Sequence, residues 1–163
     1  MSRVSSSDAA TFFVERLCPE ASNVYRLAFA LSLSREGAER CVKRVYGHLL
    51  DRVDSLRGAS TEKIRQLTTG LCWVEFRSAK EKIAAESSDL ASFLAELPVA
   101  ARAVLTAIDV LGLSEAESAK AFELSIDEVH AQLTLARKSL VNRFGTKLQS
   151  ARQEEGEDGP EDA

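Results

Sequence analysis

The chain has 163 residues, of which 45% are hydrophobic and 28% are charged, and its formal net charge is −4 at pH 7. This length suits one medium domain or two small helical ones, and the hydrophobic content is sufficient for packed cores. The acidic balance argues against a nucleic-acid binder held by overall attraction to phosphate, although a small, uneven charge leaves room for local basic faces.

The cysteines and histidines predict neither a disulfide framework nor a zinc site. Cys18, Cys41 and Cys72 lie far apart in the sequence without a C-x-x-C pair, and only His48 and His130 accompany them. Each cysteine is expected to be a small, partly buried core residue. The sequence also lacks a phosphate-binding Gly-rich loop and an acidic cluster with metal spacing. We therefore expect a protein that is not an enzyme and has no cofactor or metal.

The first seven residues are polar and are expected to be flexible. No stretch approaches the roughly 20 apolar residues of a membrane span, and the N-terminus lacks the apolar run of a signal peptide, so a cytoplasmic protein is expected. The first helix is predicted to begin near Asp8 and to stop at Pro19, and the second begins after Ser22. After a short break, apolar residues at helical spacing predict a third helix over 36–53.

A fourth helix is predicted from Ser60 or Thr61, either of which can cap it, to about Ala85. Its Gly70 costs about 1 kcal/mol relative to alanine, and a close helix crossing explains why it is tolerated. Residues 8–85 form the first predicted domain. The polar stretch that follows lacks periodicity, and we assign residues 86–93 to a linker.

The second predicted domain spans 94–148 and ends in a helix-turn-helix. Pro98 stands in the first turn of a helix that Gly112 ends. Two capping boxes then mark helix starts eleven residues apart, Ser114 with Glu117 and Ser125 with Glu128. The longer second helix has an apolar stripe facing the first, made of Ile126, Val129, Leu133, Ala136, Leu140 and Phe144. Residues 149–163 are acidic and are expected to be a disordered tail.

No alternation typical of strands occurs, so the chain is predicted to be all-α, with two small helical domains joined by a short linker. This layout resembles the extracytoplasmic-function sigma factors of the sigma-70 family. The segment most similar to their region 4 is LPVAARAVLTAIDVLGLSEAESAKAFELSIDEVHAQLTLARKSLVNRF. Similarity to region 2 is carried by VYRLAFALSLSREGAERCVKRVYGHLL and by IRQLTTGLCWVEFRSAKEK.

The resemblance implies a subunit that binds core RNA polymerase and recognises promoter DNA, with region 4 in the major groove of the −35 element. Its implied −35 contacts are Ser125, His130, Ala131, Gln132, Thr134, Arg137 and Lys138. Its implied −10 contacts are Arg65, Trp73, Arg77 and Lys80. The implied partner-binding face, for the polymerase clamp or an anti-sigma factor, holds Arg40, Lys43 and Arg44.

Several of these positions depart from the family pattern. Arg40 to Arg44 make a basic face where the family has an acidic run, which reverses the sign of that contact. Gly70 and Val74 stand where the family places Asn and Asp. The predicted recognition helix carries few cations, and Glu123 occupies a turn position where glycine is usual.

Three functional hypotheses follow. The chain is a sigma factor, or a sigma-like regulator, that acts with RNA polymerase at promoter DNA. Alternatively, it is a sigma mimic whose altered faces bind an anti-sigma factor or another protein. The third hypothesis is a helical scaffold with a vestigial helix-turn-helix.

Overall fold

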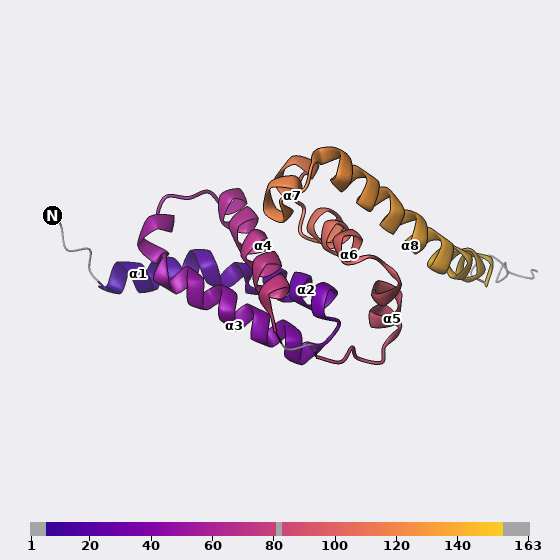
Figure 1. Ribbon diagram of the computed structural model, residues 1–163, viewed down its shortest axis with the longest axis horizontal. Coiled ribbons are helices and arrows are strands. Elements are labelled where there is room, and N and C mark those ends of the chain that lie inside the picture. Colours follow the sequence, from indigo (N-terminus) through magenta and orange to yellow (C-terminus); the bar gives the residue numbers. More distant parts are fainter. Residues whose placement is uncertain (1–5, 81–82, 155–163) are drawn as a thin grey trace, which may run out of the picture.

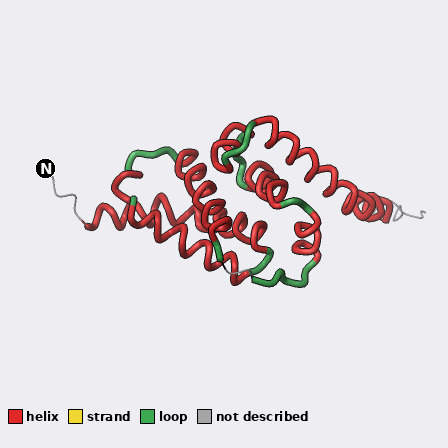
Figure 2. Tube along the Cα trace, viewed as in Figure 1, coloured by secondary structure: helices red, strands yellow, loops and turns green. Residues whose placement is uncertain are grey.

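The computed structural model describes residues 6–80 and 83–154, and these residues form helices and loops without a strand. The all-α prediction is therefore confirmed. The molecule is elongated, with α1 to α4 in its N-terminal half and α5 to α8 in its C-terminal half (Figure 1). Short loops connect most of the helices (Figure 2). Within the described ranges, no single helix has the length and apolar content needed to cross a membrane, although the bent pair Asp89–Glu96 and Val99–Val110 passes that test together.

The first two helices follow each other almost without interruption. Helix α1 (Ser6–Phe12) continues through a π-helical turn (Phe13–Leu17) and a 3-10 turn (Cys18–Glu20) into α2 (Ala21–Ser32). The predicted stop at Pro19 is therefore wrong. Pro19 lies in the first turn of the 3-10 segment, where its missing N–H costs no hydrogen bond.

Serine side chains begin the next two helices. Helix α3 (Arg35–Asp51) starts after Ser34, whose hydroxyl accepts a hydrogen bond from the Gly37 N–H. Helix α4 (Thr61–Ser78) starts after Ser60, which accepts from Lys63 N–H and confirms the predicted cap. Helix α4 ends at Ser78, several residues before the predicted end near Ala85.

The segment that connects the halves ends before most of the predicted linker at 86–93. Ser88 caps α5 (Asp89–Glu96), so the greater part of that range is helical. The connecting segment is also attached to the N-terminal half. Glu86 donates its N–H to the Leu33 carbonyl at 2.7 Å, and its carboxylate accepts the Arg35 N–H at 2.9 Å. The open backbone groups between α2 and α3 are thereby satisfied.

The C-terminal half contains three further helices. Helix α6 (Val99–Leu105) continues through a π-helical turn (Thr106–Val110), and Gly112, at φ +76°, follows it as predicted. Helix α7 is Glu115–Phe122 and α8 is Ile126–Glu154. Helix α8 extends past the predicted boundary at 148, so the tail expected at 149–163 is helical up to Glu154. The rest of that tail lies outside the described residues.

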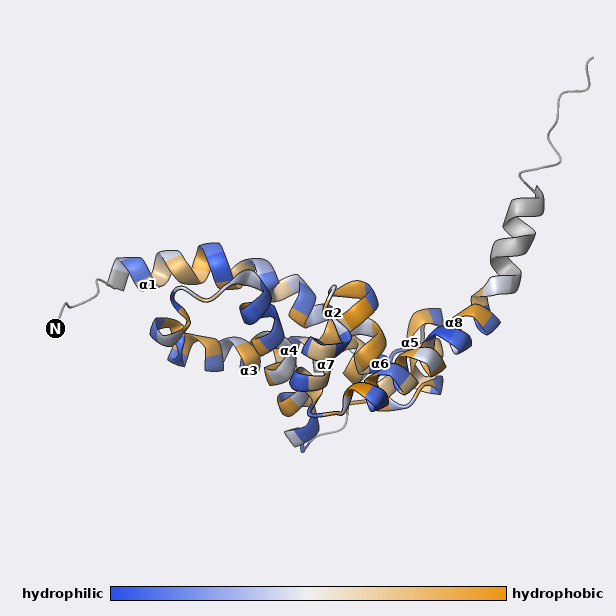
Figure 3. Cartoon of the chain, turned by 90° about the horizontal axis from the view of Figure 1, so that it is seen from above, coloured by the Kyte–Doolittle hydropathy of each residue, from blue (hydrophilic) through white to orange (hydrophobic). Residues whose placement is uncertain are grey.

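The two halves share one hydrophobic core rather than standing apart on a linker. Helix α4 packs against α7, and α2 packs against α6 (Figure 1). Hydrophobic residues are prominent on α6 and on the helices around it (Figure 3). At the centre of the contact, Trp73 of α4 meets Phe122 of α7 edge to face, with ring centroids 5.2 Å apart. Both side chains are buried.

A buried arginine adds a polar connection between the halves. Arg102 of α6 is 7% exposed, and its guanidinium donates to the Leu31 carbonyl of α2 at 3.2 Å. Burial lowers the pKa of Arg102. A buried guanidinium without a hydrogen-bond acceptor would be destabilising, so Arg102 favours the docked position that brings it to the Leu31 carbonyl.

Glycine substitutions test the α4–α7 contact. A Cβ at Gly70 would lie 3.4 Å from the backbone oxygen of Ala121, whereas a Cβ at Gly47 in α3 would meet nothing within 4 Å. Gly70→Leu should lower the free energy of unfolding by about 2 kcal/mol, because its larger side chain cannot fit against the α7 backbone. The control Gly47→Leu should raise it by about 0.5–1 kcal/mol through helix propensity. Urea unfolding measures the free energy of unfolding of both variants. Equal effects of the two substitutions would contradict a close crossing of α4 and α7.

Candidate DNA- and partner-binding surfaces

The helix-turn-helix is built by the two predicted capping boxes. The Ser114 hydroxyl accepts from Glu117 N–H at 3.1 Å, and the Glu117 carboxylate accepts from Ser114 N–H at 2.7 Å. Ser125 and Glu128 repeat the same pair of bonds at 3.1 and 2.7 Å. Glu123 has a left-handed backbone, φ +55°, at the turn where the sequence placed it. Both helix starts are thus set by local side chains.

The apolar stripe of α8 is shorter than the sequence predicts. Val129, Leu133 and Ala136 are buried, and Phe144 packs edge to face on Phe93 of α5 with centroids 5.3 Å apart. Ile126 and Leu140, assigned to the same stripe, are 53% and 38% exposed.

The outward face of α8 is a shallow surface with mixed chemistry. It is lined by His130, Ala131, Thr134, Leu135, Lys138 and Ser139. Ser125 is occupied as a cap, and Gln132 is half-buried, so neither is free to contact a base in this conformation. Hydrogen bonds from Ser125 lower the pKa of the Glu128 carboxyl, which keeps a negative charge at the start of the helix.

Two of the predicted −35 contacts are engaged by acids of the same half. Arg137 makes a bidentate pair with Asp109, at 2.6 and 3.1 Å. His130 Nδ1 lies 3.2 Å from a Glu115 carboxylate oxygen. The Asp109 carboxylate raises the pKa of Arg137. DNA phosphates would have to compete with these acids for the same two side chains.

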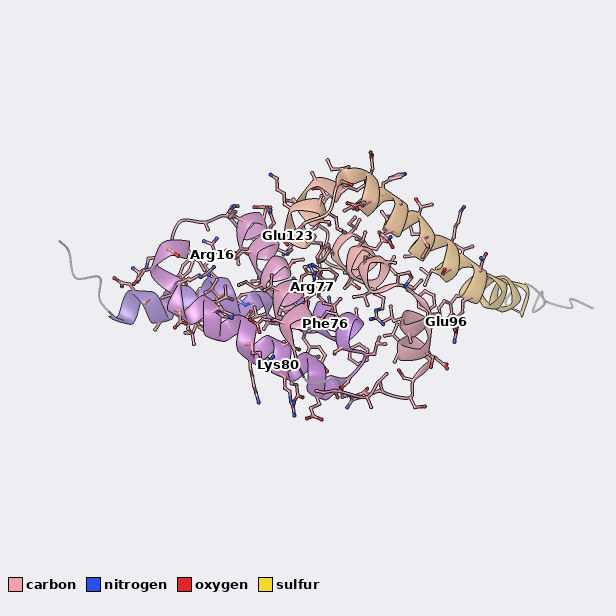
Figure 4. All side chains as sticks on the ribbon, in the orientation of Figure 1. Arg16, Phe76, Arg77, Lys80, Glu96 and Glu123 are labelled. Atoms are coloured by element: carbon pink, nitrogen blue, oxygen red, sulfur yellow. The ribbon has the colours of Figure 1, made fainter. Side chains whose placement is uncertain are left out.

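The predicted −10 contacts divide into buried and exposed residues. Trp73 is 7% exposed and lies in the core beneath α7. Arg77 stands over its ring, 5.7 Å from the centroid. Arg77 and Lys80 project near the end of α4 (Figure 4). Base stacking on Trp73 therefore requires α7 to move away from α4.

Arg65 connects the two halves. Its guanidinium donates twice to Glu20, at 3.0 and 3.1 Å, and once to the Leu111 carbonyl of the C-terminal half at 3.4 Å. Burial opposes ionisation of Glu20, but hydrogen bonds from Arg65 and Asn23 outweigh it and hold the pKa of that carboxyl below its ordinary value. The sequence did not predict this pair, because its members are 45 residues apart.

The three predicted partner-binding residues lie exposed along α3. Arg40 pairs with Glu36 one turn earlier at 2.6 Å. Arg40 and Arg44 also line a cavity of about 420 Å³ between α2, α3 and the end of α4. Arg77 and Phe76 contribute from α4 (Figure 4). The surface therefore combines an arginine rim with an apolar interior.

The match to a known family falls on the C-terminal half. Residues 87–140 match the family model described as sigma-70, region 4. This half is therefore similar to the region 4 domain of sigma-70 proteins. The match covers the helix-turn-helix with both capping boxes, and a comparison with curated protein sequences found no match.

Two solved structures share the fold of the sigma-like chain. The first is CnrH in complex with the cytosolic domain of CnrY, with a TM-score of 0.68 and 16% identity over 86% of this chain and 94% of that one. The second is the anti-anti-sigma factor PhyR complexed with the anti-sigma factor NepR from Bartonella quintana, with a TM-score of 0.60 and 19% identity. That match covers 80% of this chain and 50% of PhyR, so the chain spans half the length of PhyR.

The region 4 match and the shared fold agree with the predicted resemblance to sigma factors of the extracytoplasmic-function type. At this level of identity the structural comparisons establish the fold. Together with the region 4 match, they support a sigma-like regulator. Its choice of DNA, polymerase or protein partner depends on the surfaces described above.

The ion pair of Glu20 and Arg65 makes a pH-dependent contribution to stability. Because the folded-state pKa of Glu20 is lowered, this contribution is present above the ordinary pKa of 4.5 and is lost as the pH falls through the folded value. Glu20→Gln should lower the free energy of unfolding by about 2 kcal/mol near neutral pH. The loss should shrink in acid, as measured by urea unfolding across pH. Glu15→Gln, at an exposed acid, is the control, and a parallel shift of both variants would contradict the assignment.

Proposed function

We propose that this sigma-like regulator acts chiefly through a protein partner of the anti-sigma type, bound at the arginine-rimmed cavity of α3 and α4. The observation that carries the proposal is the closed packing of the two halves, which buries Trp73 under Phe122. When the two halves are packed in this way, Trp73, the aromatic residue predicted to contact the −10 element, is covered. Its surface at Arg40, Lys43 and Arg44 remains exposed.

The chemistry of the cavity indicates an acidic, amphipathic partner segment. Three exposed arginines, Arg40, Arg44 and Arg77, line the cavity against a single acid, Glu75. Ala28, Leu31 and Phe76 add apolar contacts to the same lining. An acidic helix can pair its carboxylates with the arginines and bury one apolar side chain between them. Both related structures are complexes with a further protein, CnrY or NepR. This agrees with protein binding as the use of the fold.

The residues predicted to contact DNA also favour a protein partner over DNA. In the recognition helix, Arg137 is paired with Asp109 and His130 with Glu115. Leu135, 43% exposed, occupies the middle of the outward face. Few phosphate contacts remain for such a helix, and a small number of cations gives weak, salt-sensitive binding.

A charge-reversal experiment tests the proposal. The tagged full chain is purified from its native cell, the retained protein is identified, and its affinity for the purified chain is measured by calorimetry. Arg44→Glu should weaken this complex by about tenfold or more, because it places like charges across the interface. The matched control Lys138→Glu, on α8, should leave the affinity unchanged. Equal affinities for the wild type and Arg44→Glu would contradict the proposed surface.

Promoter recognition with RNA polymerase is the second candidate function. It is favoured by the region 4 match and by Thr134 and Lys138, which are exposed on the uncovered face of α8. If polymerase is the partner, Arg44→Glu should strengthen binding to the core enzyme, because it restores an acid on α3. Lys138→Glu should abolish promoter-dependent transcription in a reconstituted assay. Absence of core polymerase binding at low salt would exclude this function.

A further inference from the structure

Two cysteines that are distant in sequence meet in the core of the N-terminal half. Cys41 of α3 and Cys72 of α4 have their Sγ atoms 3.5 Å apart. The Cys41 thiol also lies 3.7 Å from the Cys72 carbonyl oxygen, and the Cys72 thiol lies 3.9 Å from the Val24 carbonyl oxygen. The two thiols are therefore held facing each other across neighbouring helices.

The two cysteines differ in their access to small molecules, and this difference favours oxidation that begins at Cys41. Cys41 lines the cavity described above, together with Arg40 and Arg44, whereas Cys72 is fully buried behind it. A small oxidant entering the cavity reaches Cys41 first. The hydrogen bond with Cys72 lowers the pKa of the Cys41 thiol against the opposing effects of burial and Glu75, and Arg44 adds a smaller lowering effect. The same hydrogen bond and burial raise the pKa of the Cys72 thiol.

We propose that Cys41 and Cys72 are a redox pair that a hydroperoxide converts into a disulfide between α3 and α4. The sulfur atoms need to approach from 3.5 Å to about 2 Å, a small movement for side chains already in contact. The pair belongs to the N-terminal half and does not depend on the partner proposed above. It does, however, share the wall of the cavity at which that partner would bind.

The reaction proceeds in two steps that balance. The Cys41 thiolate attacks one peroxide oxygen, the O–O bond breaks, and the hydroperoxide is reduced to an alcohol or water as Cys41 becomes a sulfenic acid. The Cys72 sulfur then attacks the Cys41 sulfur, the S–S bond forms and the S–O bond breaks. The departing hydroxide takes the Cys72 proton and leaves as water. Two thiols are oxidised and one peroxide is reduced.

The bond would connect α3 to α4 beside the arginines at the cavity opening. Such a cross-link closes the loop between residues 41 and 72 and restricts the unfolded chain. The oxidised protein should therefore unfold at a higher urea concentration than the reduced protein. A thiol reductant should reverse the change.

The test uses the full chain with Cys18→Ser, because Cys18 is exposed and would form bonds between molecules. After hydrogen peroxide treatment under folded conditions, the protein is denatured, alkylated with N-ethylmaleimide and weighed by mass spectrometry. The expected product carries no alkyl label, is lighter by two hydrogen atoms and yields a Cys41–Cys72 linked peptide. Recovery of two labelled thiols, or of sulfinic acid on Cys41, would overturn the proposal.

Two single substitutions in the same background establish the roles of the thiols. With Cys72→Ser, Cys41 should stop at sulfenic acid or oxidise further, since no second thiol is present to form the disulfide. With Cys41→Ser, the buried Cys72 should react at least about tenfold more slowly with peroxide. Equal peroxide reactivity in the two variants would contradict attack through the cavity. Circular dichroism before treatment checks that both variants are folded.

Discussion

The contact between α4 and α7 is the constraint on which the arrangement of this protein depends. Trp73 meets Phe122 in an edge-to-face contact, and the missing side chain of Gly70 lets α4 approach the backbone at Ala121. The docked position then brings Arg65 to Leu111 and Arg102 to Leu31. Together these contacts turn two small helical units into one body with a common core.

This closed body decides which surfaces are available. Of the residues predicted to contact the −10 element, Arg65 and Trp73 lie at the junction, and Trp73 is covered by it. The basic face of α3 lies away from the junction and stays exposed. A partner that binds the closed form more tightly than an open one would stabilise it, whereas base stacking on Trp73 would require α7 to move away from α4. The proposed protein binding accordingly needs a smaller change in structure than base stacking on Trp73.

The cavity beside α3 links the two proposals without making one depend on the other. The arginines that line it could pair with the carboxylates of an acidic partner. Cys41 also lines the cavity and contacts the buried Cys72. A disulfide at this position would alter the surface that a partner meets. The proposed partner surface and the proposed redox pair therefore share a single wall of α3 and α4.

Local chemistry allowed the sequence by itself to determine the all-α class, both capping boxes of the helix-turn-helix and the Ser60 cap of α4. Each of these depends on residues within one helical turn. Only the tertiary structure decided that Trp73 is covered, that Arg65 pairs with Glu20 and that Cys41 faces Cys72. These pairs join residues that are 31 to 49 positions apart, and spacing along one helix carries no information about which neighbour packs on it. The same limit explains the exposed Leu140, since helical periodicity does not say which element covers each position of the stripe.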